Sequence, residues 1–288
     1  MYKSQKRLMM MALVPALAAG SLMAQNATAQ VKLAEYDNPP SVKRVDTVFM
    51  EDMTWLEIKN ELEAGKTTVL VPAGGLEASG PFLTLNKHQN MLRGTTDLIA
   101  RKLGNALIAP FIKYTPADEP IGVRGNYLGD FSISVATYKA TLMDICASLR
   151  DHGFTDIMLI GDHQGAQRGM KEVADELDSK WMGGPAQVTY VPEYYDRTAV
   201  RAHITNALGI TEVRAGLGDN YFNTSILLAV EPSGARLNER TEGGQLTVNG
   251  VNLEPVGQTV ENGKQIMEMQ TDLTVKAIQE AISGGNNR

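Results

Sequence analysis

The stretch LVPAGGLEASGPFLTLNKHQNMLRG, residues 70–94, decides how the fold of this chain is interpreted. It begins as an apolar strand and runs into paired glycines, a lone glutamate at Glu77, a Gly-Pro turn and then Lys87-His88. Short apolar, β-branched runs of this kind are typical of strands in a sheet that is covered on both faces. A carboxylate and an imidazole that follow such a strand are candidates for a functional site at its carboxyl end.

Strands and helices alternate on both sides of this stretch. Short apolar runs predict strands at 67–72, 106–112, 155–160 and 186–192, and amphipathic runs predict helices at 54–65, up to Gly104, at 134–153, 168–181 and 262–283. This alternation predicts an α/β fold with a mainly parallel sheet and helices on both faces. Ligands of such sheets bind beyond the carboxyl ends of the strands. We therefore expect one site built from loops 73–96, 113–131 and 161–168, with 213–225 as a fourth candidate segment.

The first 29 residues have the pattern of a secretory signal peptide. Basic residues at positions 3, 6 and 7 precede an apolar run, and Ala27-Thr28-Ala29 offers a small-x-small cleavage site. The alternative is an N-terminal membrane anchor, but the apolar run is short and is interrupted by Pro15 and Gly20. We therefore expect a periplasmic or secreted protein, free of the membrane after cleavage, with an extended arm at 30–50 and one domain at 51–288.

Composition narrows the classes of function. The chain has 288 residues with 43% hydrophobic content, which is enough for one sizeable core. Its formal net charge is −6 and it has no basic cluster, which argues against a nucleic-acid partner. The single cysteine, Cys146, cannot form an intramolecular disulfide and lies in an apolar helical pattern, where a buried inert thiol is expected.

The four histidines are placed informatively. His88 and His163 fall in loops predicted to share the strand-end edge, with Glu77 in the first loop and Asp162 beside His163. Imidazole and carboxylate groups together are typical ligands of a divalent ion such as zinc or manganese, which acidifies a bound water for hydrolysis. The alternative is a set of polar turn residues that cap helix N-termini. Spacing alone leaves both interpretations open.

Four segments resemble, in the same order, motifs of the creatininase family of metal-dependent amidohydrolases. They are VPAGGLEASGPFLTL (71–85), GDHQGAQ (161–167), RAGLGDNYFNTSILLAVEP (214–232) and VENGKQIMEMQTDLTVKAI (260–278). The first is similar to the family's Pro-x-Gly-(Ser/Thr)-x-Glu-Gln-His-Gly-Pro-His, and the second to its Asn-Gly-His-Gly-Gly-Asn. The resemblance covers about residues 50–282. It implies a creatininase-like three-layer α/β fold, often assembled into homo-oligomers, with a one- or two-metal centre that hydrolyses a C–N amide bond.

Residue by residue, the resemblance implies that Glu77 and His163 are metal ligands. Without a gap, His88 falls where the family has a bridging aspartate, whereas an insertion would place Asp97 there. We favour His88 because the Lys-His-Gln segment resembles a variant motif of secreted, creatininase-like proteins. Asp97 also suits the first turn of a helix, where the helix dipole stabilises a carboxylate.

Three of the positions that depart from the family pattern bear on the ligand set and the pocket. Ser79 stands where the family has a ligand histidine, Phe82 replaces the histidine of Gly-Pro-His, and Asn223 replaces an acidic residue before Thr-Ser. These changes argue against a full two-metal site, and we expect the three side chains to contact substrate instead. Asp162 and Asp219 are then the spare carboxylates that would transfer protons.

Arg124 and Tyr127 lie in a glycine-rich segment, GVRGNYLGD, which we predict to orient a carboxylate-bearing substrate. The alternative is a solvated loop with tight turns at its glycines. Together these observations predict a hydrolase that acts on a small-molecule amide. The competing hypothesis is a catalytically silent relative that binds a small molecule in the periplasm.

Overall fold

The computed structural model describes residues 41–117, 128–213 and 218–285. Contacts divide the chain into a unit that ends at Arg44 and a unit spanning Val45–Arg288. The second unit carries all the helices and strands described here. The predicted signal peptide, most of the predicted arm, Arg124 and Tyr127 lie outside the described residues, so these assignments stay predictions.

The elements alternate along the chain much as the sequence predicts. The helices are α2 (Trp55–Glu63), α3 (Lys87–Leu103), α4 (Val135–Asp151), α5 (Gln164–Lys180), α6 (Arg197–Asn206), α7 (Tyr221–Val230), α8 (Leu237–Glu242) and α9 (Val256–Gly285), with short 3₁₀ turns η1 (Met50–Asp52), η2 (Pro192–Tyr195) and η3 (Pro232–Ala235). The strands are β1 (Thr68–Ala73), β2 (Ala106–Ile108), β3 (Asp156–Gly161), β4 (Gln187–Tyr190), β5 (Thr247–Val248) and β6 (Val251–Asn252).

Strands β1 to β4 form a parallel sheet in the order β2-β1-β3-β4. The central pair is in register from Thr68 opposite Asp156 to Ala73 opposite Gly161. The two central strands therefore end side by side, and the segments that follow them start from the same edge of the sheet. This parallel sheet confirms the α/β fold expected from the sequence.

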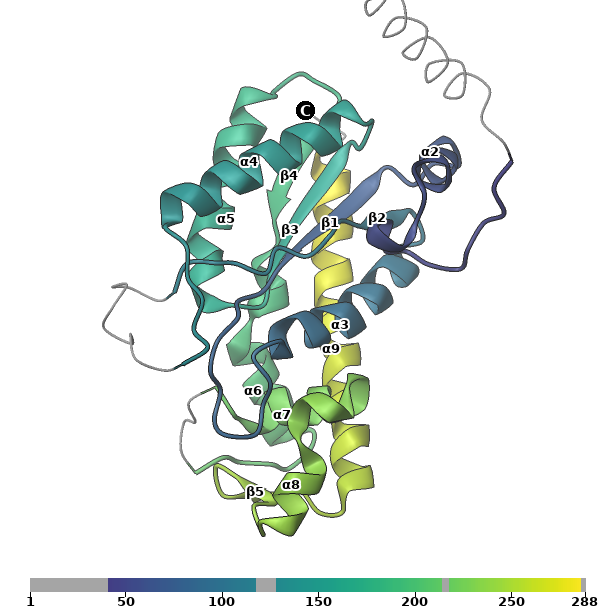
Figure 1. Ribbon diagram of the computed structural model, residues 1–288. Coiled ribbons are helices and arrows are strands. Elements are labelled where there is room, and N and C mark those ends of the chain that lie inside the picture. Colours follow the sequence, from purple (N-terminus) through teal and green to yellow (C-terminus); the bar gives the residue numbers. More distant parts are fainter. Residues whose placement is uncertain (1–40, 118–127, 214–217, 286–288) are drawn as a thin grey trace, which may run out of the picture. The chain divides into compact units, whose positions relative to one another are not determined.

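Alternating residues of the strands face two different hydrophobic cores. On one face, Val69, Val71 and Ile157 pack with Leu142 of α4 and Met170 of α5. The opposite face packs against α3 and α9, with core residues that include Leu70, Ile108, Met158, Ile99 and Ile278. Figure 1 shows the sheet between these two pairs of helices. The result is the expected three-layer arrangement, with helices on both faces.

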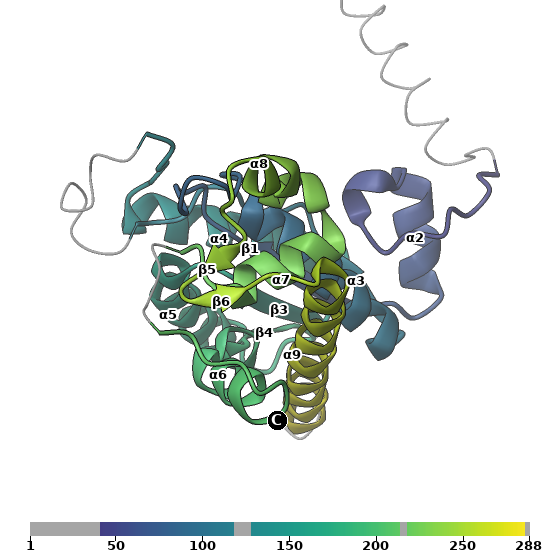
Figure 2. The same ribbon diagram turned by 90° about the horizontal axis from the view of Figure 1, so that it is seen from below.

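A third core lies beyond the end of the sheet, where α7 packs against α9 and α3. Figure 2 shows α7 and α9 side by side. Gly263 of α9 makes this close approach feasible, because a Cβ atom there would lie 2.1 Å from the Ser225 carbonyl oxygen of α7. The glycine thus sets how closely the helices approach.

We expect Gly263→Ala to lower the free energy of unfolding by about 2–3 kcal/mol, because the methyl group would force apart two packed backbones. Gly257→Ala is the matched control, since the same atom at that position of α9 meets nothing within 4 Å. The control should be neutral or slightly stabilising, because alanine favours helix more than glycine does. Urea unfolding of both variants would check this, and equal stabilities would contradict the packing argument.

Three features of the fold differ from the sequence-based prediction. Helix α3 begins at Lys87, so the predicted loop 73–96 was wrong over its second half. Helix α9 begins at Val256, earlier than the predicted residue 262. Helices α6, α7 and α8 and strands β5 and β6 have no counterpart among the predicted helix and strand ranges. Among the described helices, none combines the length and apolarity needed to cross a bilayer.

Candidate active site

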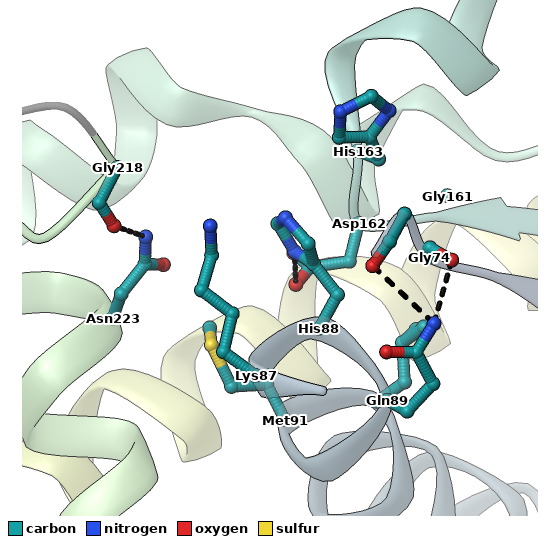
Figure 3. A network of polar contacts seen from close by, with 12 residues as sticks. Gly74, Lys87, His88, Gln89, Met91, Gly161, Asp162, His163, Gly218 and Asn223 are labelled. Atoms are coloured by element: carbon teal, nitrogen blue, oxygen red, sulfur yellow. Dashed lines mark hydrogen bonds and ion pairs between the residues drawn. The ribbon is translucent and has the colours of Figure 1, made fainter. Parts of the chain in front are cut away.

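The predicted site residues meet where β1 and β3 end. Glu77 lies four residues beyond β1, whereas Asp162 and His163 directly follow β3. His88 occupies the first turn of α3, and not a loop as the sequence suggested. Figure 3 shows His88 and Asp162 facing each other across the strand ends.

Two glycines after β1 allow the histidines to lie close to the backbone. A Cβ atom at Gly74 would lie 2.8 Å from Cβ of His88, and one at Gly75 would lie 2.9 Å from the ring of His163. Gln89 of α3 donates a hydrogen bond from Nε2 to the Gly74 carbonyl oxygen at 2.6 Å, drawn in Figure 3. The paired glycines of the sequence motif thus leave room for the start of α3 to pack closely against the end of β1.

The carboxylate of Glu77 joins the two imidazoles. Its Oε1 lies 3.0 Å from Nε2 of His88, and its Oε2 lies 3.1 Å from Nε2 of His163. The two rings stand edge to face with centroids 5.5 Å apart. Each carboxylate oxygen of Glu77 therefore contacts one of the two histidines.

The outer nitrogen of each imidazole is also held. His88 Nδ1 lies 2.8 Å from Oδ2 of Asp162, and His163 Nδ1 lies 3.0 Å from Oγ1 of Thr115. Metal-binding histidines are usually anchored in this way through the ring nitrogen that does not face the ion. The structure thus fixes both rings with Nε2 directed at Glu77.

Asp162 is fully buried and bridges two cationic or polar partners. Its Oδ1 accepts a hydrogen bond from Nη2 of Arg197 at 3.0 Å, while Oδ2 faces His88. Burial alone would raise the pKa of Asp162, but the charge of Arg197 and the contact with His88 outweigh it and lower the pKa. The guanidinium of Arg197 lies over the rings of Tyr195 and Phe222, which hold it in place.

Glu77 is kept ionised by its surroundings. Burial again favours the protonated form, but hydrogen bonds with His163 and His88 and the charge of Lys87 bring its pKa well below the usual range. Lys87 Nζ lies 2.6 Å from Oε1 of Glu77 and also donates to Oγ of Ser79. The Lys87 side chain is completely buried.

A cleft of about 490 Å³ opens onto this cluster. Glu77, His88 and His163 line one part of it. Side chains from α6 and α7 line another part, together with the segment 210–213 and Asn249; those from the two helices include Arg197, Val200, Ile204, Phe222 and Asn223. Asn223 donates from Nδ2 to the Gly218 carbonyl oxygen at 2.7 Å, whereas its Oδ1 has no hydrogen-bond partner among the described residues. The cleft thus offers a small molecule access to the three candidate ligands.

Other residues singled out in the sequence lie further away. Ser79 is buried against Lys87 and does not line the cleft, and Phe82 packs under the guanidinium of Arg240. Asp219 lies against Gly80, where a Cβ atom would meet its carboxylate. Asp97 pairs with Arg101 on the surface of α3 at 3.0 Å, so His88 and not Asp97 stands beside Glu77.

Sequence reasoning missed three members of the cluster, namely Lys87, Thr115 and Arg197. Lys87 stands next to His88 in the motif, and that adjacency was the signal that could have drawn attention to it. Thr115 and Arg197 follow strand β2 and the turn after β4, and nothing in their local sequence marks them as site residues. Their proximity arises only from the order of the strands in the sheet.

The donor atoms suit one divalent ion. Carboxylate oxygen and imidazole nitrogen are the usual ligands of zinc and also bind manganese. His88 faces a carboxylate oxygen with each ring nitrogen, so a proton or a metal ion must lie between its Nε2 and Glu77. Over the ranges that the structure describes, no three His, Cys, Asp or Glu side chains are already arranged as a metal site. Coordination would replace the two Glu77–imidazole hydrogen bonds.

Comparison with known proteins identifies relatives of this chain. A sequence profile of the creatininase family, described as creatinine amidohydrolase, matches residues 51–278. The creatinine amidohydrolase of Pseudomonas putida is 28% identical over 118 residues, which are 41% of this chain and 45% of that enzyme. The matching segment therefore spans less than half of the length of this curated relative.

Solved structures of creatininases share the fold. A creatininase crystal structure is 21% identical with a TM-score of 0.61, covering 82% of this chain and 98% of that one. A mutant creatininase of the Zn-Zn type is 22% identical with a TM-score of 0.59, covering 82% and 99%. A manganese form, described as Creatininase Mn, is 21% identical with a TM-score of 0.56, covering 82% and 98%. The family profile matches most of this chain, and the solved creatininases share its fold. The chain therefore belongs to the creatininase family.

Proposed function

We propose that this protein is an amidohydrolase that uses a divalent ion, zinc or manganese, to cleave the C–N bond of a small cyclic or linear amide. One observation carries the proposal: the two oxygens of Glu77 lie 3.0 and 3.1 Å from Nε2 of His88 and His163, and both rings are anchored through Nδ1. The relatives support it, because the creatininase structures include Zn-Zn and Mn forms.

The chain's own groups would prepare this centre for hydrolysis. An ion held by Glu77, His88 and His163 would supply an acidified water and polarise the scissile carbonyl. Asp162 accepts a hydrogen bond from Nδ1–H of His88, which leaves the lone pair of Nε2 available for a metal ion on the cleft side. Thr115 orients His163 in the same way.

The remaining cleft residues would bind the substrate and move protons. Apolar side chains of α6 and Phe222 exclude water from one wall, and the unpartnered Oδ1 of Asn223 would accept a hydrogen bond from a substrate N–H. Asp219 does not line the cleft, and its carboxylate lies against Gly80, so it would have to turn toward the cleft to protonate the leaving nitrogen. We also propose that the protein is exported and forms homo-oligomers.

Bound metal is the first quantity that tests the proposal. We expect untagged mature protein to hold close to one zinc or manganese per protomer by elemental mass spectrometry. His163→Ala should reduce this to a small fraction, because it removes one of three donors. His152→Ala is the matched control, since that exposed histidine is the C-cap residue of α4 and does not line the cleft. It should leave the metal content unchanged.

Two outcomes would contradict the proposal. Wild type that stays metal-free after incubation with both ions would exclude this mechanism, and the protein would then be a silent relative that binds a small molecule. Equal metal in wild type and His163→Ala would show that the ion binds elsewhere. Metal-loaded wild type would next be screened for ring opening of cyclic amides and for release of amines from linear amides.

A further inference from the structure

A lysine ammonium group lies behind the three candidate metal ligands. Nζ of Lys87 lies 2.6 Å from Oε1 of Glu77 and donates to Oγ of Ser79, and the Lys87 side chain is fully buried. Neither Lys87 nor Ser79 lines the cleft. Figure 3 shows the Lys87 side chain extending between His88 and Asn223. The ammonium group therefore reaches Glu77 from the buried side and cannot touch a substrate in the cleft.

The charges of the cluster already balance. Lys87 and Arg197 supply two positive charges, and Glu77 and Asp162 supply two negative charges. Each carboxylate oxygen also has a partner: Oε1 of Glu77 faces Lys87 and His88, Oε2 faces His163, and Asp162 is divided between Arg197 and His88. A first dication would add two positive charges to these four groups. Neither Glu77 nor Asp162 would offer a second dication a carboxylate oxygen that has no partner.

Space beside Ser79 is also taken. A Cβ atom at Gly218 would lie 2.7 Å from Oγ of Ser79 and 3.1 Å from Nζ of Lys87, so the Gly218 backbone packs directly against this pair. Gly218 has a φ of +81°, which an L side chain rarely adopts, and Asn223 holds its carbonyl oxygen at 2.7 Å. The backbone thus closes the buried side of Glu77 around an ammonium group.

We propose that the ammonium of Lys87 replaces a second metal ion in this centre. It neutralises Glu77 from the buried side, leaves one divalent ion on the cleft side, and weakens the binding of that ion by like-charge repulsion through the shared carboxylate. Lys87 is thus a positioning residue that sets both the number of ions and their affinity. The inference rests on the proposed metal-dependent function.

Metal counting and affinity test this inference without an assay of activity. Apo protein would be titrated with Zn²⁺ or Mn²⁺ to excess, dialysed and analysed for bound metal, and the Mn²⁺ form examined by electron paramagnetic resonance. We expect a plateau at one ion per protomer and the six-line spectrum of an isolated Mn²⁺ ion. Lys87→Met removes the charge at similar volume and should tighten binding of this ion at least tenfold. Lys102→Met is the control, because Lys102 lies exposed on the same helix and pairs with Glu268 and Asp272.

The possible results distinguish failure of the inference from failure of the function on which it rests. A plateau at two ions, or an exchange-coupled Mn²⁺ spectrum, would overturn the inference and leave the metal-dependent hydrolase intact. One ion with unchanged or weaker affinity in Lys87→Met would also overturn it. Wild type without any bound ion would remove the proposed function and the inference together. The wild-type count and spectrum stand even if Lys87→Met does not fold.

Discussion

Asp162→Ala is expected to lower the free energy of unfolding by about 2–4 kcal/mol, because it leaves the partly buried guanidinium of Arg197, whose side chain is 29% exposed, without its counter-ion. Asp162 has no exposed surface and uses both carboxylate oxygens, one on Arg197 and one on His88. Removing the buried partner of such a pair costs more than the net contribution of the pair, since the remaining Arg197 charge stays partly desolvated. The same change would free the ring of His88 to rotate away from Glu77.

Chemical unfolding of the variant beside Asp97→Ala would measure this effect. Asp97 forms an ion pair with Arg101 at 3.0 Å, four residues along α3, but both side chains are partly exposed. We expect the Asp97 variant to lose less than about 1 kcal/mol, as exposed pairs of this kind do. A loss below about 1 kcal/mol for Asp162→Ala would show that Arg197 finds another partner or reaches water.

Glu77→Gln is expected to reduce amide hydrolysis about a thousandfold or more, equivalent to roughly 4 kcal/mol of transition-state stabilisation. The amide keeps the shape of the side chain but removes the charge that faces Lys87 and both imidazoles. Without that carboxylate the centre has two neutral nitrogens and a buried ammonium, which together repel a dication. Both metal content and turnover should therefore fall.

Turnover of an amide that the wild type cleaves would be compared with the same substitution at Glu61. Glu61 is also buried and pairs with a lysine, Lys66, at 2.7 Å, but it lies on α2 and does not line the cleft. Glu61→Gln should keep activity within about twofold. If Glu77→Gln kept a third or more of wild-type turnover, Glu77 could not be the central ligand. Circular dichroism would establish that both variants are folded.

The sheet and most helices could be predicted from the sequence for simple physical reasons. Strands β1 and β3 are short, apolar and rich in branched residues, because helices cover both of their faces. Helix α4 begins after Ser134, whose side chain accepts a hydrogen bond from the backbone N–H of Thr137, and this cap is visible in the sequence. Such local signals depend on a few neighbouring residues, so they can be recognised without knowledge of the tertiary structure.

The start of α3 could not be predicted, and the reason lies in the site. The first turn carries Lys87, His88 and Gln89, all of them buried although polar. A helix that buries polar groups in an active site has no clear apolar stripe there, so periodicity fails where the chemistry is densest. Asn86 at its N-cap makes no side-chain capping bond, which removes the other local signal.

The sequence by itself determined the α/β class, the strand-end location of the site, and Glu77, His88 and His163 as its candidate ligands, since each of these depends on local pattern or motif order. Only the tertiary structure decided that His88 rather than Asp97 stands beside Glu77, and that Lys87, Thr115 and Arg197 complete the cluster. These residues are brought together by strand order and by the pairing of buried charges. Such pairing joins groups that are far apart in the chain. The cost of burying a charge is offset only when its partner lies at the right distance, and no short segment of sequence specifies that distance.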